Sequence, residues 1–139
     1  MKKKILLLML LSSLQLFALE CTKEQYYPYF YVERYLPAST STNMNKSVFD
    51  KKSVKYDNKN IIRVWFTDQL RQQPNVDIML TYTEFNIKDN TYRFLQHTGY
   101  KCNGRLLGVE NGDEIWKAIT PESVMENKLE TLKKYLKIK

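Results

Sequence analysis

The sequence predicts an α+β fold, in which an antiparallel meander sheet of about five to six strands carries a C-terminal helix packed on one face. Three observations predict this fold. Stretches of alternating apolar and polar residues follow one another through the middle of the chain with short connections, which favours antiparallel pairing of neighbours. Asparagine-containing turns separate several of these stretches. The final stretch changes from the period of a strand to that of a helix.

Length and composition indicate one globular domain. The chain has 139 residues, of which 43% are hydrophobic and 27% are charged, as is typical of soluble proteins. The formal net charge is +7, but Lys2, Lys3 and Lys4 contribute three of these charges in a segment that we expect to be removed. The remaining excess is well short of that of a dedicated nucleic-acid binder, so no nucleic-acid partner is expected.

Residues 1–18 have the pattern of a secretory signal peptide. Three lysines precede an apolar run that begins at Ile5, and the small residue Ala18 marks the expected cleavage site. A membrane anchor is the alternative, but the run is shorter than the roughly 20 residues that a spanning helix needs. A lipoprotein is disfavoured because Glu20 precedes Cys21, where a small residue is required. We therefore expect an exported protein, in the periplasm or at the surface of a Gram-negative-type bacterium.

Export determines how the cysteines are interpreted. The mature chain would keep two, Cys21 and Cys102, and an oxidising compartment favours their pairing. Free or intermolecular thiols are the alternative. Two cysteines and one histidine are too few for a zinc site of the common kinds, so no metal is expected.

An aromatic and β-branched run from Tyr26 to Tyr35 predicts the first strand, and Pro28 places its first half at a sheet edge. This strand and the following loop form an N-terminal segment over 19–47. A tyrosine-lined side of the strand would be a candidate recognition surface. The alternatives are ordinary packing and a homodimer seam formed by an edge strand. Alternation brings four residues to that side: Tyr27, Tyr29, Tyr31 and Tyr35.

The main domain is expected over 48–139, and its strongest strand alternates cleanly. Ile62, Val64 and Phe66 fall on one face of it, with Arg63 and Trp65 on the other. Asn103-Gly104 predicts a tight hairpin turn, because both residues accept a positive φ. The expected strands cover 48–50, 53–56, 60–67, 76–87 and 92–98.

The last element is a predicted amphipathic helix. Ser123 and Glu126 have the spacing of a capping box, and Pro121 sets the entry of the chain. A stripe of apolar residues would pack on the sheet, formed by Met125, Leu129, Leu132 and Leu136. The lysines are expected off this stripe: Lys128, Lys133, Lys134, Lys137 and Lys139.

Three of those lysines form a candidate patch for an anionic glycan or another acidic partner. They are Lys133, Lys134 and Lys137. The alternative is a solvated helix face that keeps the protein soluble.

Several segments together resemble the surface-adhesin protein E-like family. They are Val48-Phe49-Asp50, Ser53, Arg63-Val64-Trp65, and the closing run from Trp116 to Glu126. The resemblance extends from about Val48 to Tyr135 and implies an antiparallel sheet with a packed C-terminal helix, and a role in adhesion or host-ligand binding. Trp116 and Ile119 are expected beneath the junction of helix and sheet. The resemblance implies structural roles for Trp65, Tyr100, Trp116, Ile119, Pro121, Ser123 and Glu126.

The sequence departs from this family in its cysteines. Family members often join a late strand to the end of the helix, whereas here the helix ends at 136–139 without a cysteine. Any disulfide would therefore join Cys21 to Cys102.

The sequence contains no recognisable catalytic constellation. His97 is the one histidine, and no second group is fixed near it for haem binding or base catalysis. No serine has a base and an orienting group around it, and no glycine-rich loop precedes a helix. We expect a non-catalytic module without a cofactor that binds an extracellular-matrix or envelope protein, or an anionic glycan. The alternative is a periplasmic structural or accessory protein.

Overall fold

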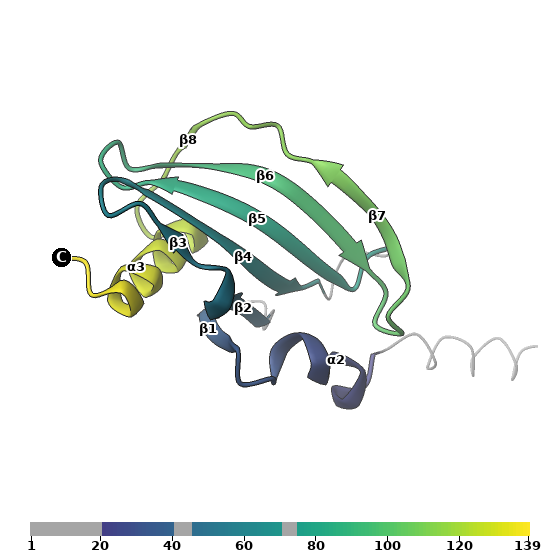
Figure 1. The fold of residues 1–139 in the computed structure, drawn as a ribbon. Helices are drawn as coiled ribbons and strands as arrows, with labels where there is room; N and C mark the ends of the chain where they lie inside the picture. The colour runs from purple at the N-terminus through teal and green to yellow at the C-terminus, as the bar shows by residue number, and fades with distance from the viewer. Residues whose placement is uncertain (1–20, 41–45, 71–74) are drawn as a thin grey trace, which may run out of the picture.

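The computed structural model describes residues 21–40, 46–70 and 75–139. The predicted signal peptide at 1–18 lies outside them, as does part of the loop expected within the N-terminal segment 19–47. The predicted α+β class is confirmed: one antiparallel sheet has the order β1-β2-β4-β5-β6-β7, and the short strands β3 and β8 pair with β4 and β6 (Figure 1). The elements are α2 (Lys23–Phe30), β1 (Tyr35–Thr40), β2 (Lys46–Asp50), η1 (Lys51–Ser53), β3 (Lys55–Tyr56), β4 (Ile61–Gln69), β5 (Ile78–Asn86), β6 (Thr91–Tyr100), β7 (Leu106–Asn111), β8 (Lys117–Ala118) and α3 (Val124–Leu136).

The core lies between one face of the sheet and α3. Ile62, Val64 and Phe66 of β4 are buried there, as their alternation predicts. Leu129 and Leu132 of α3 belong to the same cluster, and Met125 and Leu136 pack at its margin. The predicted helical stripe is therefore confirmed. We call this side of the sheet the core face.

Lys128 was expected off the apolar stripe of the helix, but the structure buries it beside the core. Its side chain is buried and its Nζ donates to both carboxylate oxygens of Asp68, at 3.0 and 3.1 Å. The ammonium also lies 4.6 Å from the centre of the Phe66 ring. The charge is tolerated beneath α3 because a carboxylate and an aromatic face replace the water that it loses.

The start of α3 follows the predicted capping pattern with one shift. Ser123 is the N-cap, and its Oγ accepts a hydrogen bond from the Glu126 N–H at 3.2 Å. The Glu126 carboxylate accepts from the N–H of Glu122, at 2.6 Å, where the sequence pattern predicts Ser123. The exposed Pro121 precedes this turn. Ser123 thus satisfies a backbone N–H that the first helical turn leaves unpaired, and Glu126 satisfies one in the turn just before the helix.

The predicted strand over residues 26–35 is wrong, because the first half of this run belongs to the helix α2 and a turn follows before β1 begins at Tyr35. Thr22 and Gln25 form a capping box at its start: Thr22 Oγ1 accepts from the Gln25 N–H at 3.3 Å, and Gln25 Oε1 accepts from the Thr22 N–H at 2.9 Å. Pro28 lies inside this short helix. A satisfied cap and the burial of Phe30 outweigh the strand preference of the tyrosines.

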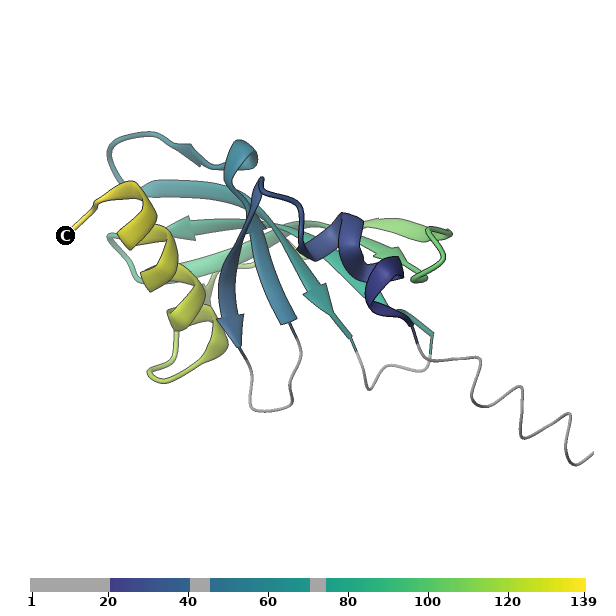
Figure 2. The ribbon, with the colours of Figure 1, turned by 90° about the horizontal axis from the view of Figure 1, so that it is seen from below.

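The helix α2 packs on the opposite side of the sheet from α3. Phe30 clusters with Val48 and Ile78, whereas Phe49, the chain neighbour of Val48, belongs to the core beneath α3. Successive side chains of a strand point to opposite faces, so the two clusters lie on different sides. Figure 2 shows the two helices toward opposite ends of the molecule, with β1 and β2 between them.

A β-bulge in β6 depends on Gly112. Tyr82 pairs with Gln96 and Thr83 with Phe94, which leaves Leu95 as an extra residue in β6. The Gly112 N–H donates to the Leu95 oxygen at 3.0 Å. A Cβ at position 112 would lie 1.9 Å from the Phe94 carbonyl oxygen. Only a residue without a side chain therefore allows this approach of the two backbones.

Gly112→Ala is accordingly expected to lower the free energy of unfolding by about 1–3 kcal/mol, because the strand must move away from the added methyl group. Urea denaturation followed by circular dichroism measures the change. Gly108→Ala is the matched control, since a Cβ there meets nothing within 4 Å. Equal denaturation midpoints for the two variants would contradict this account of the bulge.

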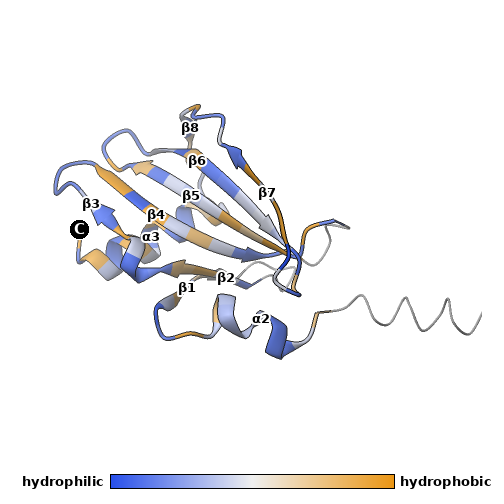
Figure 3. Ribbon diagram, turned by 45° about the vertical axis from the view of Figure 1, so that its right-hand side comes forward, coloured by the Kyte–Doolittle hydropathy of each residue, from blue (hydrophilic) through white to orange (hydrophobic). Residues whose placement is uncertain are grey.

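The sheet ends on one side at β7, an exposed apolar edge strand. Leu106 is 52% exposed, and Leu107 and Val109 are also exposed, which gives the outermost strand its orange stretch in Figure 3. Free strand edges of this kind can pair with another chain, and homodimerisation through an edge strand stays a prediction. In the ranges that the structure describes, no helix combines the length and apolar character needed to cross a bilayer.

Candidate functional site

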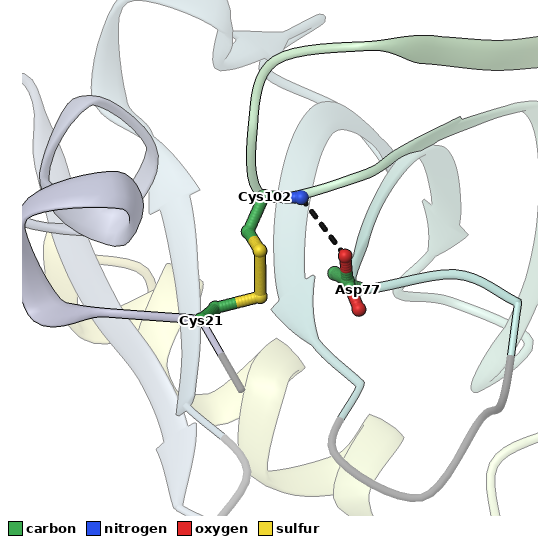
Figure 4. A group of neighbouring side chains, drawn as sticks. All are labelled: Cys21, Asp77 and Cys102. Carbon is green, nitrogen blue, oxygen red and sulfur yellow. Dashed lines mark hydrogen bonds between the residues drawn. A yellow bond between two sulfur atoms is a disulfide. The ribbon is translucent and has the colours of Figure 1, made fainter. Parts of the chain in front are cut away.

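Cys21 and Cys102 form a disulfide, with their Cα atoms 5.8 Å apart, so the predicted pairing is confirmed (Figure 4). The bond joins the segment before α2 to the turn after β6. Asp77 supports the turn, because its Oδ2 accepts from the Cys102 N–H at 2.9 Å. A disulfide is consistent with an oxidising, exported location.

The disulfide and Asp77 are also the one group of possible metal ligands found in the described ranges. Thiolates, rather than disulfide sulfurs, bind metals. With both sulfurs bonded to each other, this junction is structural.

The four candidate tyrosines do not form the predicted common surface. Tyr27 of α2 and Tyr31, the residue that caps its end, are exposed and stack on each other, with ring centres 5.9 Å apart. Tyr29 packs against Tyr100 at the same separation, and Tyr35 belongs to the cluster around Phe30. Burial raises the pKa of Tyr29, as do the nearby Tyr100 and Tyr35. The four tyrosines thus divide into an exposed pair and two packing residues.

The three candidate lysines lie in the last turn of α3 and just after it. Lys133 pairs with Glu130, at 3.0 Å between Nζ and Oε1, and Lys134 is exposed. Lys137 ends the helix in the left-handed conformation at φ 57°, with its N–H directed to the last carbonyls. Since α2 and α3 lie toward opposite ends of the molecule (Figure 2), the lysines and the tyrosines do not make one site.

The residues of the closing run have different surroundings. Ile119 is buried in the core, as expected. Trp116 is 39% exposed, so its expected place beneath the helix is wrong. Its ring lies instead 4.5 Å from the guanidinium carbon of Arg93. The reason is that β8, which directly follows Trp116, pairs along the edge of β6. This pairing places Trp116 at the surface of the sheet.

His97 belongs to β6 and lies on the core face of the sheet. It pairs with Thr81 in the register, and its Nδ1 is 3.3 Å from the Thr81 hydroxyl. The ring also lies 5.1 Å from Phe94. The expectation that His97 has no haem partner stays a prediction.

The side of the sheet opposite α3 carries two rows of functional groups beyond the part that α2 covers; we call this area the open face. In the first row, Arg63 pairs with Glu84, and Glu84 pairs with Arg93. In the second row, Trp65 pairs with Tyr82, and Tyr82 pairs with Gln96. The rows are two residues apart along the strands, or roughly 7 Å. Chain segments from 63 to 96 therefore meet in one compact area.

The first row contains a buried carboxylate between two guanidinium groups. Glu84 is only 2% exposed, whereas the side chains of Arg63 and Arg93 are 45% and 29% exposed. The Arg63 Nε donates to Glu84 Oε2, and the Arg93 Nε donates to Oε1 at 2.7 Å. The hydrogen bond and charge of Glu84 raise the pKa of Arg63. A buried carboxylate needs compensation, but one arginine would balance its charge, so the cluster keeps an excess positive charge.

The second row places aromatic groups beside those cations. Trp65 and Tyr82 stack with ring centres 5.0 Å apart and planes 16° from parallel. Such a cross-strand pair stabilises the sheet and fixes both rings. The indole N–H and phenol O–H remain hydrogen-bonding groups on a half-exposed surface. The arrangement can therefore bind anionic and hydroxyl groups at the same time.

The open face was missed in the sequence because its members are scattered. Arg63 and Trp65 belong to β4, but Glu84 and Arg93 come from β5 and β6. The bulge at Leu95 also changes which residues of β6 face this side. The sequence signal that points to this row is the charged Glu84, which lies within a strand whose other residues mostly favour β-structure.

The comparisons with known proteins give no family for this chain. No protein-family model matches it, and no curated protein matches it either. The similarity to the surface-adhesin protein E-like family accordingly stays a prediction.

Proposed function

We propose that the protein is an exported, non-catalytic binding module that recognises a host or envelope macromolecule through the open face. The observation that carries this proposal is the row of Arg63, Glu84 and Arg93, in which a buried carboxylate holds two half-exposed guanidinium groups. Stability needs only one counter-charge at Glu84. Arginine, tryptophan and tyrosine are also the residues that most often dominate the energetics of binding surfaces.

The chemistry of the open face supports binding rather than catalysis. Its charged groups are paired with one another, and its aromatic rings are stacked. The single histidine lies on the other side of the sheet, against Thr81. Fixed donors of this kind orient a partner without supplying a nucleophile or a proton acceptor.

The second candidate function is a periplasmic structural or accessory protein, and the edge strand β7 favours it. Its exposed Leu106 and Val109 lie on the last strand of the sheet in the part of the chain that the structure describes. Another envelope component could add a strand to this edge. This function would use β7 and leave the open face free.

Two measurements test the proposal. Protease treatment of intact cells, compared with lysed cells, shows whether the mature chain is reachable from outside, as an adhesin must be. Labelled mature protein is then titrated onto intact host cells and onto isolated cell envelopes. We expect saturable binding to one of these surfaces and at least a tenfold loss with Arg63→Gln.

The control is Lys139→Gln, which removes an exposed cation at the carboxyl end, away from the open face. This variant should bind like the wild type. Absence of saturable binding to both surfaces would overturn the proposal, as would equal losses for the two variants. Binding that is lost on Leu106→Lys but retained in Arg63→Gln would favour the accessory function instead.

A further inference from the structure

We infer that the ligand of the open face is an acidic polysaccharide, a chain of sugars that carry carboxylate or sulfate groups; this deepens the proposed binding function and rests on it. The structure places a line of cations and a line of neutral hydrogen-bonding groups side by side on a surface that no helix covers. An acidic sugar chain presents the complementary pattern of anionic groups and hydroxyls.

The line of cations crosses four strands. Lys55 of β3 pairs with Arg63, and the row continues through Glu84 to Arg93. Three strand spacings make this row roughly 14 Å long. It is therefore long enough to meet acid groups on successive sugars rather than a single small anion.

The charges of this row favour a polyanion. Lys55, Arg63 and Arg93 are three cations, whereas Glu84 is buried beneath them. Asp57 also lies near Arg63, but its Oδ1 already accepts three backbone N–H groups, from Lys59, Asn60 and Ile61. Cations thus outnumber carboxylates at the surface. Glu84 engages Arg63 through Nε, so the terminal nitrogens of Arg63 can form the paired hydrogen bonds that carboxylate and sulfate oxygens accept.

The neighbouring row supplies partners for sugar hydroxyls. Trp65 contributes an indole N–H, Tyr82 a phenol O–H and Gln96 an amide that both donates and accepts. These groups lie roughly 7 Å from the cations, two residues further along the strands. Acid groups and hydroxyls of the same sugar chain could then be bound together.

The geometry of the rings disfavours single-stranded nucleic acid, the other common polyanion. Proteins that bind it offer exposed ring faces on which bases stack. Here Trp65 and Tyr82 stack on each other, and Arg93 lies against the face of Trp116. An extended peptide is disfavoured as well, because it would pair with a strand edge, whereas this row crosses the middle of a sheet.

Binding of the purified mature chain to immobilised polymers tests this inference. The probes are heparin as the sulfated polymer, polygalacturonate as the carboxylated polymer, neutral dextran, and a single-stranded DNA oligonucleotide. We expect saturable binding to heparin or polygalacturonate that weakens with added salt, and no binding to dextran. The two acidic probes distinguish sulfate from carboxylate as the recognised group.

Variants locate the site. Arg63→Gln and Lys55→Gln are each expected to weaken binding at least fivefold, and Lys139→Gln to leave it unchanged. Lys55 makes no ion pair with Glu84, so its variant keeps the test valid if Arg63→Gln impairs folding. The double variant Lys134→Gln/Lys137→Gln tests the competing patch on α3.

Three outcomes would overturn the inference: no saturable binding to either acidic polymer, tighter binding to the oligonucleotide, or loss only in the α3 double variant. Equal weakening by every lysine variant would also overturn it, because it would indicate unspecific attraction to a basic protein. If binding to cells or envelopes depends on Arg63 while both acidic polymers fail, the polysaccharide is wrong and the proposed function stands. If both kinds of binding are absent, both proposals fail.

Discussion

Replacing both Cys21 and Cys102 with serine is expected to lower the free energy of unfolding by up to about 4–5 kcal/mol. The two cysteines are 81 positions apart, so the bond removes much of the conformational freedom of the unfolded chain. Serine preserves the approximate size of each side chain. A loss of this size is a large part of the stability of an ordinary domain, and urea denaturation at neutral pH measures it directly.

The same substitution should release α2 before the rest of the molecule. Beyond the disulfide, this helix is held mainly by Phe30 and the neighbouring tyrosines. Amide hydrogen exchange should therefore quicken in α2 while β4 and β5 stay protected. Wild-type protein reduced with dithiothreitol is the control and should have the same denaturation midpoint as the double variant. A loss below about 1 kcal/mol would contradict a stabilising role of the bond.

Leu132→Ala is expected to destabilise the fold by about 2–5 kcal/mol. Leu132 is 0% exposed and packs with Leu129 against the sheet, so truncation removes apolar contacts and leaves a cavity. Loss of this contact would also weaken the ion pair between Lys128 and Asp68, which lies under the same helix. Thermal denaturation followed at 222 nm should show a midpoint lower by roughly 10 °C or more.

Leu106→Ala is the matched control for this prediction. It makes the same chemical change on the exposed edge strand β7, where substitutions usually alter stability by less than about 0.5 kcal/mol. If the two variants had similar midpoints, α3 would not be packed on the sheet as described.

The sequence predicted those elements whose periodicity and end signals agree. The strand β4 could be predicted because Ile62, Val64 and Phe66 alternate with more polar residues. The helix α3 could be predicted because its leucine stripe follows a serine cap. In both cases the local pattern coincides with the surface that the fold buries, so no long-range information was needed.

The N-terminal tyrosines show where this reasoning failed. Their β-propensity predicts a strand, whereas Thr22 and Gln25 form a capping box that begins the helix α2. Tyrosine has only a modest disadvantage in a helix, so a cap and the burial of Phe30 decide the conformation. Pro28, which was expected to place the strand at a sheet edge, is tolerated in this short helix because it removes only one backbone hydrogen bond.

A charged Glu84 within a strand could have drawn attention to the open face, but which residues meet there could not be predicted, because this depends on register. Glu84 meets Arg63 and Arg93 only when three strands are aligned, and the extra residue at Leu95 determines which side chains of β6 face them. Strand pattern gives the face of each side chain but not the residue opposite it.

Both tryptophans of the chain lie in or beside the open face, Trp65 in contact with Tyr82 and Trp116 against Arg93. The intrinsic indole fluorescence of the native protein therefore originates entirely from this area, and none of it from α2, α3 or β7. A ligand that displaces water or the Arg93 guanidinium there would alter the emission spectrum without any label. Tryptophan fluorescence can therefore report binding at the place where we propose that the ligand binds.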